Sequence, residues 1–592
     1  MSANVPEPAV THGAAVAGPS QVIMVSHLRK AYGETVAVDD VSFAVAEGEI
    51  FGLLGPNGAG KTTTVECAVG LRAADAGQVQ ILGLDPDRDR DRLCLAVGVQ
   101  LQSSALPARL KVGELLDLYQ SFYPDPADTE ELAHILGLAD KRDDYYQSLS
   151  GGQKQRLSIA LALIGQPRVA VLDEMTTGLD PQARRDTWDL IEQVRDRGVT
   201  ILLVTHYMEE AERLCDEVAL VDRGRVVAAG TPEQLAHQAD AGQQVHFMPS
   251  EPFDDRLLTE LPEVSGVERH GRRVQVSGTG DLASAVIQAL SADGVTVHDL
   301  KVTSASLEDA FIKLTGRRLA SAATAPRNQG RNRPAPVTRR PLLPQTAPRR
   351  AFIKLAQAEA RLAWRQPIGL GFGLALPVLL FALLGIVFRG TSKSLGGISV
   401  AQAELPMVIV LALAMIGMFS LPTPLATYRE QGILRRLSTT PVPPAWVLGA
   451  QLVVNACIAV AALAVILVTG IAGFGLKTPA SVGGLLLSMA LTAVAVLGIG
   501  LWITGIAPNA AMAGGIAWLT FFPLSFFAGV FAPLQILPAA VRQIGGWTPL
   551  GAAFDALQHA MQTGFPPARF LLVLAGYALV SGLLAVRYFR WE

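Results

Sequence analysis

The hydrophobic positions follow two different patterns along the chain. Up to about residue 316, short runs rich in Val, Ile and Leu alternate with stretches in which apolar residues recur at helical spacing. This alternation is typical of a mostly parallel sheet covered by helices. After residue 366 there are six long apolar segments, at 367–388, 405–426, 446–474, 480–506, 510–531 and 569–588. At about 1.5 Å per residue, each can cross the roughly 30 Å of hydrocarbon in a bilayer. The chain is therefore predicted to join an α/β part to an all-α, six-helix transmembrane domain.

Composition agrees with a membrane protein. Of the 592 residues 50% are hydrophobic and only 17% are charged, against about 25% charged in a soluble domain. The net charge is −3 and neither half of the folded part is strongly basic, so no nucleic-acid partner is expected. The four cysteines lack paired spacing, so the sequence supports neither a disulfide framework nor a zinc site.

Changes in composition divide the chain into five parts. These are a disordered tail (1–21), a first α/β domain (22–238), a small accessory α/β domain (239–316), a linker rich in Arg, Pro and Ala (317–350) and the transmembrane domain (351–592). Residues 1–20 have no Lys or Arg, so they lack the basic start of a secretory signal, and we expect the first domain in the cytoplasm. The linker has nine arginines and no acid; either attraction to anionic headgroups or the solubility of a tether explains this charge. Residues 351–365 have the spacing of an amphipathic interfacial helix.

A glycine-rich loop follows the apolar run 50–54 and precedes a helix-compatible stretch. Strand, glycine loop and helix in this order predict a phosphate-binding loop, whose backbone N–H groups face phosphate oxygens. Lys61 is expected to reach the β- and γ-phosphates, and the Thr62 hydroxyl to ligate Mg²⁺. The residues of this predicted nucleotide site are Gly55, Pro56, Asn57, Gly58, Ala59, Gly60, Lys61, Thr62 and Thr63.

Two further segments carry chemistry that fits such a loop. The buried-strand run 169–172 ends in Asp173, which suits Mg²⁺, and Glu174, which suits activation of the attacking water. Residues 149–156 begin with Ser150, a favourable N-cap, and two glycines, which leave the N–H groups of the next helix open to an anion. A second anion site in a chain with one phosphate-binding loop makes sense if it completes the nucleotide pocket of another copy.

These motifs resemble those of the ABC transporter ATPases. Residues 149–156 look like the signature motif of that family, 55–63 like its Walker A and 169–174 like its Walker B. Residues 178–180 match its D-loop, and Thr205-His206 match its H-loop. All of them lie in family order between about residues 23 and 235, and no catalytic position departs from the family pattern.

The resemblance implies ATP and Mg²⁺ as cofactors and gives roles to further residues. Tyr32 would stack on adenine, His206 would contact the γ-phosphate, and Glu174 would be the catalytic base. Gln102 would be the Q-loop residue touching Mg²⁺ and water; Gln100 could take this role, but Gln102 is favoured. The remaining nucleotide-binding residues would be Ser150, Gly151, Gly152, Gln153 and Asp180.

The transmembrane part is expected in the plasma (inner) membrane with both termini in the cytoplasm. Six spans return the chain to its starting side, and arginines cluster at the linker, between spans two and three, and after span six. The segment 428–437 is similar to the coupling element of ABC type-2 exporters, which docks on the ATPase. Its predicted coupling residues are Arg429, Glu430, Gly432, Arg435 and Arg436. Residues 306–316 are similar to the ATPase tail of daunorubicin-resistance-like exporters.

One phosphate-binding loop, one signature motif and six spans make half a transporter. We therefore expect a homodimer in the lipid bilayer in which each signature loop faces the ATP of the other copy. The spans contain almost no ionisable residues, which favours export of hydrophobic or amphipathic cargo of the drug or antibiotic type. The alternatives are export of a lipid or glycan precursor, and a signal-transmitting membrane ATPase that moves no cargo.

Overall fold

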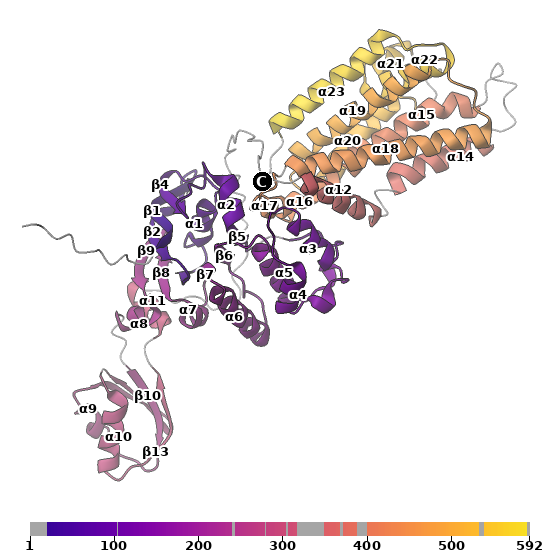
Figure 1. The fold of residues 1–592 in the computed structure, drawn as a ribbon. Coiled ribbons are helices and arrows are strands. Elements are labelled where there is room, and N and C mark those ends of the chain that lie inside the picture. The colour runs from indigo at the N-terminus through magenta and orange to yellow at the C-terminus, as the bar shows by residue number, and fades with distance from the viewer. Residues whose placement is uncertain are drawn as a thin grey trace, which may run out of the picture. The chain divides into compact units, whose positions relative to one another are not determined.

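A computed structural model describes residues 20–102, 105–238, 243–278, 280–303, 306–315, 349–366, 371–387, 400–443, 445–531 and 538–588. The chain forms two compact units, one of Met1–Gln100 and Pro167–Ala335 and one of Leu101–Gln166 and Pro336–Glu592 (Figure 1). The predicted tail, nearly all of the predicted linker and the start of the first predicted span lie outside the described residues. The segment 101–166, counted above in the first α/β domain, belongs to the second unit.

The first unit is built on a mixed nine-stranded sheet in the order β4-β1-β2-β9-β8-β3-β7-β6-β5. Its strands are β1 (Gln21–Tyr32), β2 (Thr35–Ala46), β3 (Ile50–Leu54), β4 (Ala76–Ile81), β5 (Val97–Gln100), β6 (Val169–Asp173), β7 (Thr200–Thr205), β8 (Glu217–Asp222) and β9 (Arg225–Gly230). Its helices are α1 (Lys61–Ala68), α2 (Arg90–Ala96), α6 (Pro181–Asp196), α7 (Met208–Leu214) and α8 (Pro232–Gln238). The predicted α/β class is confirmed.

The centre of this sheet is parallel and fully buried. Every residue of β3, β6 and β7 is buried, as expected for strands covered on both faces. Leu54 of β3 pairs with Thr205 of β7, and Asp173 of β6 pairs with Val204. This register brings the carboxyl ends of the three strands to one edge of the sheet, where the next residues of each strand emerge together.

A separate four-stranded antiparallel sheet, in the order β11-β12-β10-β13, forms the accessory part. Its elements are β10 (Gln243–Pro249), α9 (Arg256–Thr259), β11 (Val264–His270), β12 (Arg273–Gly278), α10 (Leu282–Ala292) and β13 (Val297–Thr303). The next helix, α11 (Leu307–Thr315), packs against α8 and α7 instead. Helix α10 covers the sheet with Leu282, Val286 and Leu290. The backbone N–H of Leu307 donates a hydrogen bond to Glu212 of α7, which ties α11 to the larger sheet.

The second unit is helical throughout its described residues. Its first helices are α3 (Val112–Gln120), α4 (Thr129–Ile135) and α5 (Gly151–Leu163), followed after the linker by α12 (Arg349–Trp364), α14 (Leu376–Val387), α15 (Val400–Met415), α16 (Pro422–Glu430), α17 (Ile433–Leu437), α18 (Ala445–Phe474), α19 (Val482–Ile506), α20 (Ala510–Phe527), α21 (Ala539–Gly545), α22 (Pro549–Gln562) and α23 (Ala568–Tyr588). Within the described residues, five helical segments are long and apolar enough to cross a membrane, and the first predicted span is represented by a shorter apolar helix, Gly373–Val387.

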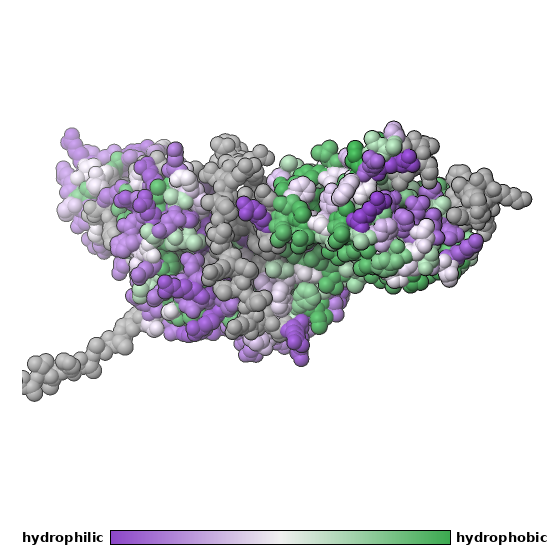
Figure 2. Space-filling view, turned by 90° about the horizontal axis from the view of Figure 1, so that it is seen from above, coloured by the Kyte–Doolittle hydropathy of each residue, from purple (hydrophilic) through white to green (hydrophobic). Residues whose placement is uncertain are grey.

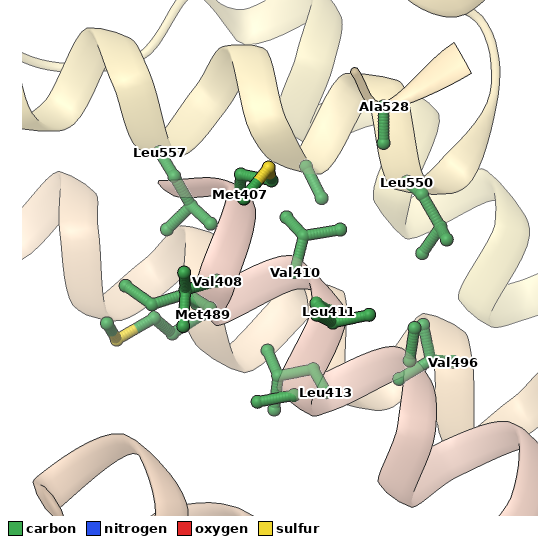
Figure 3. Packing of buried hydrophobic residues seen from close by; sticks show 14 of the residues in the cluster. Met407, Val408, Val410, Leu411, Leu413, Met489, Val496, Ala528, Leu550 and Leu557 are labelled. Carbon is green, nitrogen blue, oxygen red and sulfur yellow. The ribbon is translucent and has the colours of Figure 1, made fainter. Parts of the chain in front are cut away.

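Helix α15 is the core of this unit. In the most apolar part of the continuous segment Gln402–Glu430, which contains most of α15 and all of α16, 89% of the residues are buried, against 50% in α19, 28% in α18 and 22% in α20 and α23. Figure 3 shows side chains of α15 enclosed by Met489 and Val496 of α19 and by Leu550 and Leu557 of α22. A helix that is hydrophobic all round is an interior helix. The outer helices instead expose large apolar side chains, and hydrophobic residues cover much of the surface of the helical part in Figure 2.

Two glycines let the segment after α15 cross α19 in close contact. A Cβ atom added at Gly500 of α19 would lie 2.0 Å from the carbonyl oxygen of Gly417, and one added at Gly417 would lie 2.7 Å from the backbone of Val496. Small residues at helix crossings permit such backbone approach in membranes. The position of the central helix therefore depends on these two residues having no side chain.

We predict that Gly500→Ala destabilises the protein by about 1–3 kcal/mol, because the added methyl group overpacks this crossing. The matched control is Gly576→Ala in α23, where no atom lies within 4 Å of the added Cβ; this change should be neutral or stabilising by up to ~1 kcal/mol. Thermal unfolding of the purified protein in detergent measures both. Equal unfolding temperatures for the two variants would contradict the close crossing.

Candidate ATP-hydrolysis site and its connection to the membrane helices

The loop between β3 and α1 can be formed only by the glycines it contains. A Cβ atom at Gly55 would lie 2.1 Å from the carbonyl oxygen of Val221, and one at Gly60 would lie 2.3 Å from that of Ala37. Gly58 and Gly60 have φ angles of 84° and 100°, which L side chains rarely adopt. The loop therefore keeps a bare backbone with its N–H groups at the start of α1, the geometry that binds phosphate.

Lys61 lies across this loop. Its ammonium group donates hydrogen bonds to the carbonyl oxygens of Gly55 (2.7 Å) and Pro56 (3.0 Å). Burial lowers the pKa of Lys61, while the carboxylates of Glu174 and Asp173 act in the opposite direction. A cation is thus held on the loop, beside the acids at the end of β6.

Asp173 is the fully buried last residue of β6. Its backbone N–H donates a hydrogen bond to the side-chain oxygen of Gln100, the last residue of β5 (3.1 Å). Thr62 stands in the first turn of α1. A carboxylate and a hydroxyl beside a phosphate-binding loop are hard oxygen donors that fit Mg²⁺, which takes its other ligands from phosphates and water.

Glu174 and His206 come together at the carboxyl ends of β6 and β7. The Oε1 atom of Glu174 lies 3.4 Å from Nδ1 of His206, and both side chains are largely buried, at 5% and 13% exposure. Glu174 has a φ of 47°, and its backbone N–H donates to the carbonyl of Val204 (2.8 Å). A non-glycine residue in this region costs about 1–3 kcal/mol, and such strain concentrates at functional sites.

Helix α7 contributes a further buried carboxyl group. Glu210 of α7 is completely buried and accepts a hydrogen bond from the indole N–H of Trp188 (3.0 Å). Burial raises the pKa of Glu210, although hydrogen bonds from Thr205, Trp188 and Thr176 lower it in part. Glu210 therefore links α7 to α6 and to the end of β7. This role is not predictable from the sequence, because a single glutamate in an amphipathic helix normally faces solvent.

In the second unit, α17 docks directly on α5. Arg436 of α17 is buried, and its guanidinium donates to the hydroxyl (3.1 Å) and the carbonyl oxygen (3.2 Å) of Ser158 in α5. The same guanidinium lies 5.8 Å from the ring centre of Tyr119 in α3. The backbone N–H of Ala105 also donates to the carbonyl of Gln431, just before α17 (3.1 Å). Helix α5 begins immediately after Ser150, so the segment after α16 contacts the helix that starts at that serine.

A second contact joins α12 to α3. Arg365 makes a two-pronged pair with the Glu114 carboxylate, at 2.6 and 2.7 Å, and Arg361 adds a weaker contact at 3.8 Å. Burial alone would raise the pKa of Glu114, but hydrogen bonds from Arg365 and the backbone of Lys111 hold it below its ordinary value. Paired N–H donors from one arginine fix orientation as well as distance.

Helix α12 also carries a buried carboxyl group toward the membrane helices. Glu359 accepts hydrogen bonds from the hydroxyl of Tyr428 (2.9 Å) and the side-chain amide of Gln451 (2.6 Å). All three side chains are buried. Burial raises the pKa of Glu359 to about 7, partly opposed by these two hydrogen bonds. Glu359 therefore ties α12 to both α16 and α18.

Comparisons with known proteins agree with this geometry. Residues 38–177 match the family model described as ABC transporter, and residues 350–561 match the one described as ABC-2 type transporter. The chain is 38% identical over 317 residues to Nod factor export ATP-binding protein I of Ralstonia nicotianae, covering 51% of this chain and 96% of the relative. It is 34% identical over 312 residues to daunorubicin resistance ATP-binding protein DrrA3 of Streptomyces coeruleorubidus, covering 51% of this chain and 98% of the relative.

The protein is an ABC transporter. It joins an N-terminal ATPase to a type-2 membrane domain in one chain, as the sequence motifs predicted, and it is a membrane-integral ATP hydrolase coupled to transport. The matches support ATP-driven export in general, and ATPase domains of this family act as dimers. Among solved structures, the ADP conformation of the ATP-binding cassette MJ1267 is 24% identical over 36% of this chain and 92% of that chain, with a TM-score of 0.34. At this TM-score the likeness adds nothing to the assignment.

Within the ABC transporter, the remaining predicted nucleotide contacts have the following positions. Tyr32 is half-buried at the end of β1, with the Arg72 guanidinium 5.3 Å from its ring centre. Asp180 is exposed and caps α6 by accepting from the backbone of Gln182 and Ala183. Their roles toward adenine and the partner's ATP stay predictions.

The two candidates for the Q-loop residue differ in surroundings. Gln100 is buried and its side-chain oxygen is bonded to the backbone of Asp173. Gln102 is exposed, in the turn after β5. The exposed position is consistent with the preference for Gln102, which stays a prediction.

The signature segment has its side chains turned onto its own helix. Ser150 and Gln153 form a reciprocal capping box, in which each side chain bonds the other's backbone N–H (3.3 and 2.9 Å). Gly151 and Gly152 make up the first turn of α5 without side chains. The capping box fixes this turn while the glycines keep its backbone accessible.

The five predicted coupling residues fall into three groups. Arg436 contacts α5, and Arg435 is half-buried on the same short helix α17. Gly432 supplies the left-handed turn before α17, with a φ of 71°. Arg429 and Glu430 contact the membrane helices α19 and α20 instead. The contacts of Arg365 and Glu359 were missed, because the pattern of residues 351–365 indicates only an amphipathic helix and not its partners.

We predict that Glu174→Gln lowers ATP turnover by at least ~10²-fold while ATP still binds, because the amide cannot take a proton from water. Phosphate release and binding of a fluorescent ATP analogue measure the two properties separately. The control is Glu233→Gln, an exposed glutamate of α8. Near-normal turnover of the Glu174 variant would remove Glu174 from the role of base.

A pH dependence follows from Glu359. Its pKa in the folded protein, about 7, lies above the ordinary value of 4.5, so its contribution to stability is greatest below about pH 4.5 and is lost as the pH rises to about 7. Glu359→Gln removes this titration, so the unfolding temperature of the variant relative to the wild type should rise by about 2 °C or more between pH 5 and pH 8. Glu308→Gln, at an exposed site of α11, should show no such trend. Parallel pH profiles of wild type and Glu359→Gln would contradict the raised pKa.

Proposed function

We propose that this ABC transporter works as a homodimeric exporter in the plasma (inner) membrane, with its ATPase domain and both termini in the cytoplasm. Each copy would complete the ATP site of the other with Ser150, Gly151, Gly152 and Gln153. The first turn of α5 is accessible, and it is not needed to build the phosphate-binding loop, which is complete on the unit that holds Lys61. Both points support the proposal that this turn binds the ATP of the other copy. Two equivalent ATP molecules would then lie between the copies.

The observation that carries the proposal is the buried contact of Arg436 with Ser158. A buried guanidinium is stable only where its donors are satisfied, and these donors are satisfied by the helix that starts at Ser150. Movement of the Ser150 turn onto ATP would therefore displace α17. The two-pronged pair between Arg365 and Glu114 provides a second, parallel link between α3 and α12.

The proposed chemistry uses the acids and the histidine at the sheet edge. ATP binds with its β- and γ-phosphates on Lys61. Glu174 takes a proton from water as the water oxygen attacks the γ-phosphorus and the bond to the ADP oxygen breaks, while His206 contacts the γ-phosphate. Mg²⁺, held by Asp173 and Thr62 with Gln102 nearby, would neutralise charge on the phosphates. Release of ADP and phosphate would let the two copies separate.

The cargo we propose is hydrophobic or amphipathic. The aromatic rings of Phe419, Trp518, Phe521 and Phe522 contact one another, mostly edge to face, with ring centres 4.5 to 5.9 Å apart. Trp518 and Phe522 are exposed, so this cluster offers an apolar surface beside the central helix. The relatives named for Nod factor export and daunorubicin resistance leave a lipid or glycan precursor as the alternative cargo. Parallel vesicle-uptake assays with labelled drugs, lipids and glycolipids separate the two.

Mixed dimers test whether the ATP site is shared. Lys61→Ala and Ser150→Phe each disable both sites of a homodimer, but a mixed dimer of the two variants keeps one intact site if Ser150 acts across the dimer. Tandem-tagged mixed dimers should then recover about half of wild-type ATP turnover, one site in two. The converse pair, wild type with a Lys61→Ala/Ser150→Phe double variant, should be inactive. Sites completed within one chain give the opposite result in both mixtures.

A further inference from the structure

The last turn of α16 reaches three different helices with three consecutive side chains. Tyr428 donates its hydroxyl to Glu359 of α12. Arg429 donates to the carbonyl oxygens of Thr504 (2.9 Å) and Ala507 at the end of α19. Glu430 accepts from the backbone N–H of Ala510, the first residue of α20 (3.3 Å). Arg429 and Glu430 thus hold both ends of the short turn between α19 and α20.

The order of the two charges matches the two helix ends. The last carbonyl groups of α19 and the first N–H groups of α20 have no partners within their own helices. Arginine stabilises the negative end of a helix, and a carboxylate stabilises the positive end. Arg429 sits at the carboxyl end of α19, and Glu430 sits at the amino end of α20, beside the N-cap Asn509. Exchanging the two residues would place each charge at the wrong helix end.

Small side chains bring these elements together. Ala426 of α16, Ala507 in the turn and Ala513 of α20 form one buried cluster. Alanines at a contact allow backbones to approach closely. The end of α16 and the α19–α20 turn are therefore joined by packing as well as by hydrogen bonds, as required of a unit that moves together.

The other end of this connection is the docking site on α5. Only Gln431 and Gly432 separate Glu430 from α17. The left-handed Gly432 makes the bend, and Arg436 is bonded to Ser158. A continuous path of hydrogen bonds and short segments thus leads from α5, through α17 and the end of α16, to the cytoplasmic ends of α19 and α20.

We infer that Arg429 and Glu430 are positioning residues that transmit the displacement of α17 to α19 and α20. This inference rests on the proposed function, since ATP must first move α5. It names the helices that receive the movement: α19 and α20, the second and third long apolar helices after the docking element, in addition to its own helix α16. Helix α20 carries Trp518, Phe521 and Phe522 of the aromatic cluster, so the transmitted movement reaches the proposed cargo surface.

Spin labels at two positions distinguish a failure of this inference from a failure of the proposed function. Asp140 is exposed in the part of the second unit that precedes α5, and Met512 is exposed in the first turn of α20. In dimers, each single label reports the distance between the two copies. Cys457, the exposed native cysteine, is replaced by Ser, and Cys67, Cys94 and Cys215 are buried. Distances are measured by pulsed electron paramagnetic resonance in nanodiscs, without nucleotide and with ATP trapped by Glu174→Gln.

With Arg429 and Glu430 present, ATP should shift both distances. In Arg429→Ala and in the exchanged variant Arg429→Glu/Glu430→Arg, the Asp140 shift should persist and the Met512 shift should fall at least about twofold. Arg429→Lys and Glu430→Gln keep one hydrogen bond each and should give intermediate Met512 shifts, which also provides a test if the stronger variants fail to fold. Arg350→Ala removes an exposed positive charge from α12 and should leave both shifts unchanged.

Two results would overturn the inference. An undiminished Met512 shift in Arg429→Ala, or in both conservative variants, means that α20 receives the movement by another route. An absent Asp140 shift with Arg429 and Glu430 intact means that ATP does not move the α5 region, which rejects the proposed function and this inference with it.

Discussion

The functional organisation depends on one buried charge, the guanidinium of Arg436. Taking an arginine out of water costs several kcal/mol unless its donors are satisfied, and here they are satisfied by the hydroxyl and carbonyl of Ser158 and by the face of Tyr119. Removing α5 from α17 would leave this charge buried without partners. The contact is thus costly to break, and it joins the helix after the signature motif to the segment that leads into the membrane helices.

The geometry of the ATP site depends instead on the register of the parallel strands. Because β3, β6 and β7 end at one edge of the sheet, the phosphate loop, Glu174 and His206 emerge side by side although they are distant in the sequence. Strand register also explains the strained backbone of Glu174: its N–H bonds to Val204 while its side chain turns toward His206. The sheet thus holds the predicted catalytic residues at one edge.

The charged residues that link α3, α12, α16, α19 and α20 each have a matching partner: an opposite charge, neutral hydrogen-bond donors or a helix end. Arg365 meets Glu114, Glu359 meets two neutral donors, and Arg429 and Glu430 meet the ends of α19 and α20. Glu114, Glu359, Arg365 and Arg429 are at least partly removed from water, where hydrogen bonds are stronger, and Glu430 is exposed. Helices joined by such hydrogen bonds can move together, because breaking a bond would leave a polar group without its partner, which costs free energy.

Local patterns in the sequence determined the phosphate loop, the acids after β6, the signature turn and the long apolar segments. Each of these depends on residues that are neighbours along the chain: glycines where a side chain would clash, carboxylates after a buried strand, or twenty apolar residues in a row. The tertiary structure alone decided which charges meet. The resemblance predicts coupling roles for Arg429 and Glu430, and only the structure shows that they contact the α19–α20 turn. Arg365, Glu359 and Glu210 carry no local sign of their partners. Trp188 lies 22 residues from Glu210, and Glu114 lies 251 residues from Arg365; only the packing of the helices brings such distant residues within hydrogen-bonding distance.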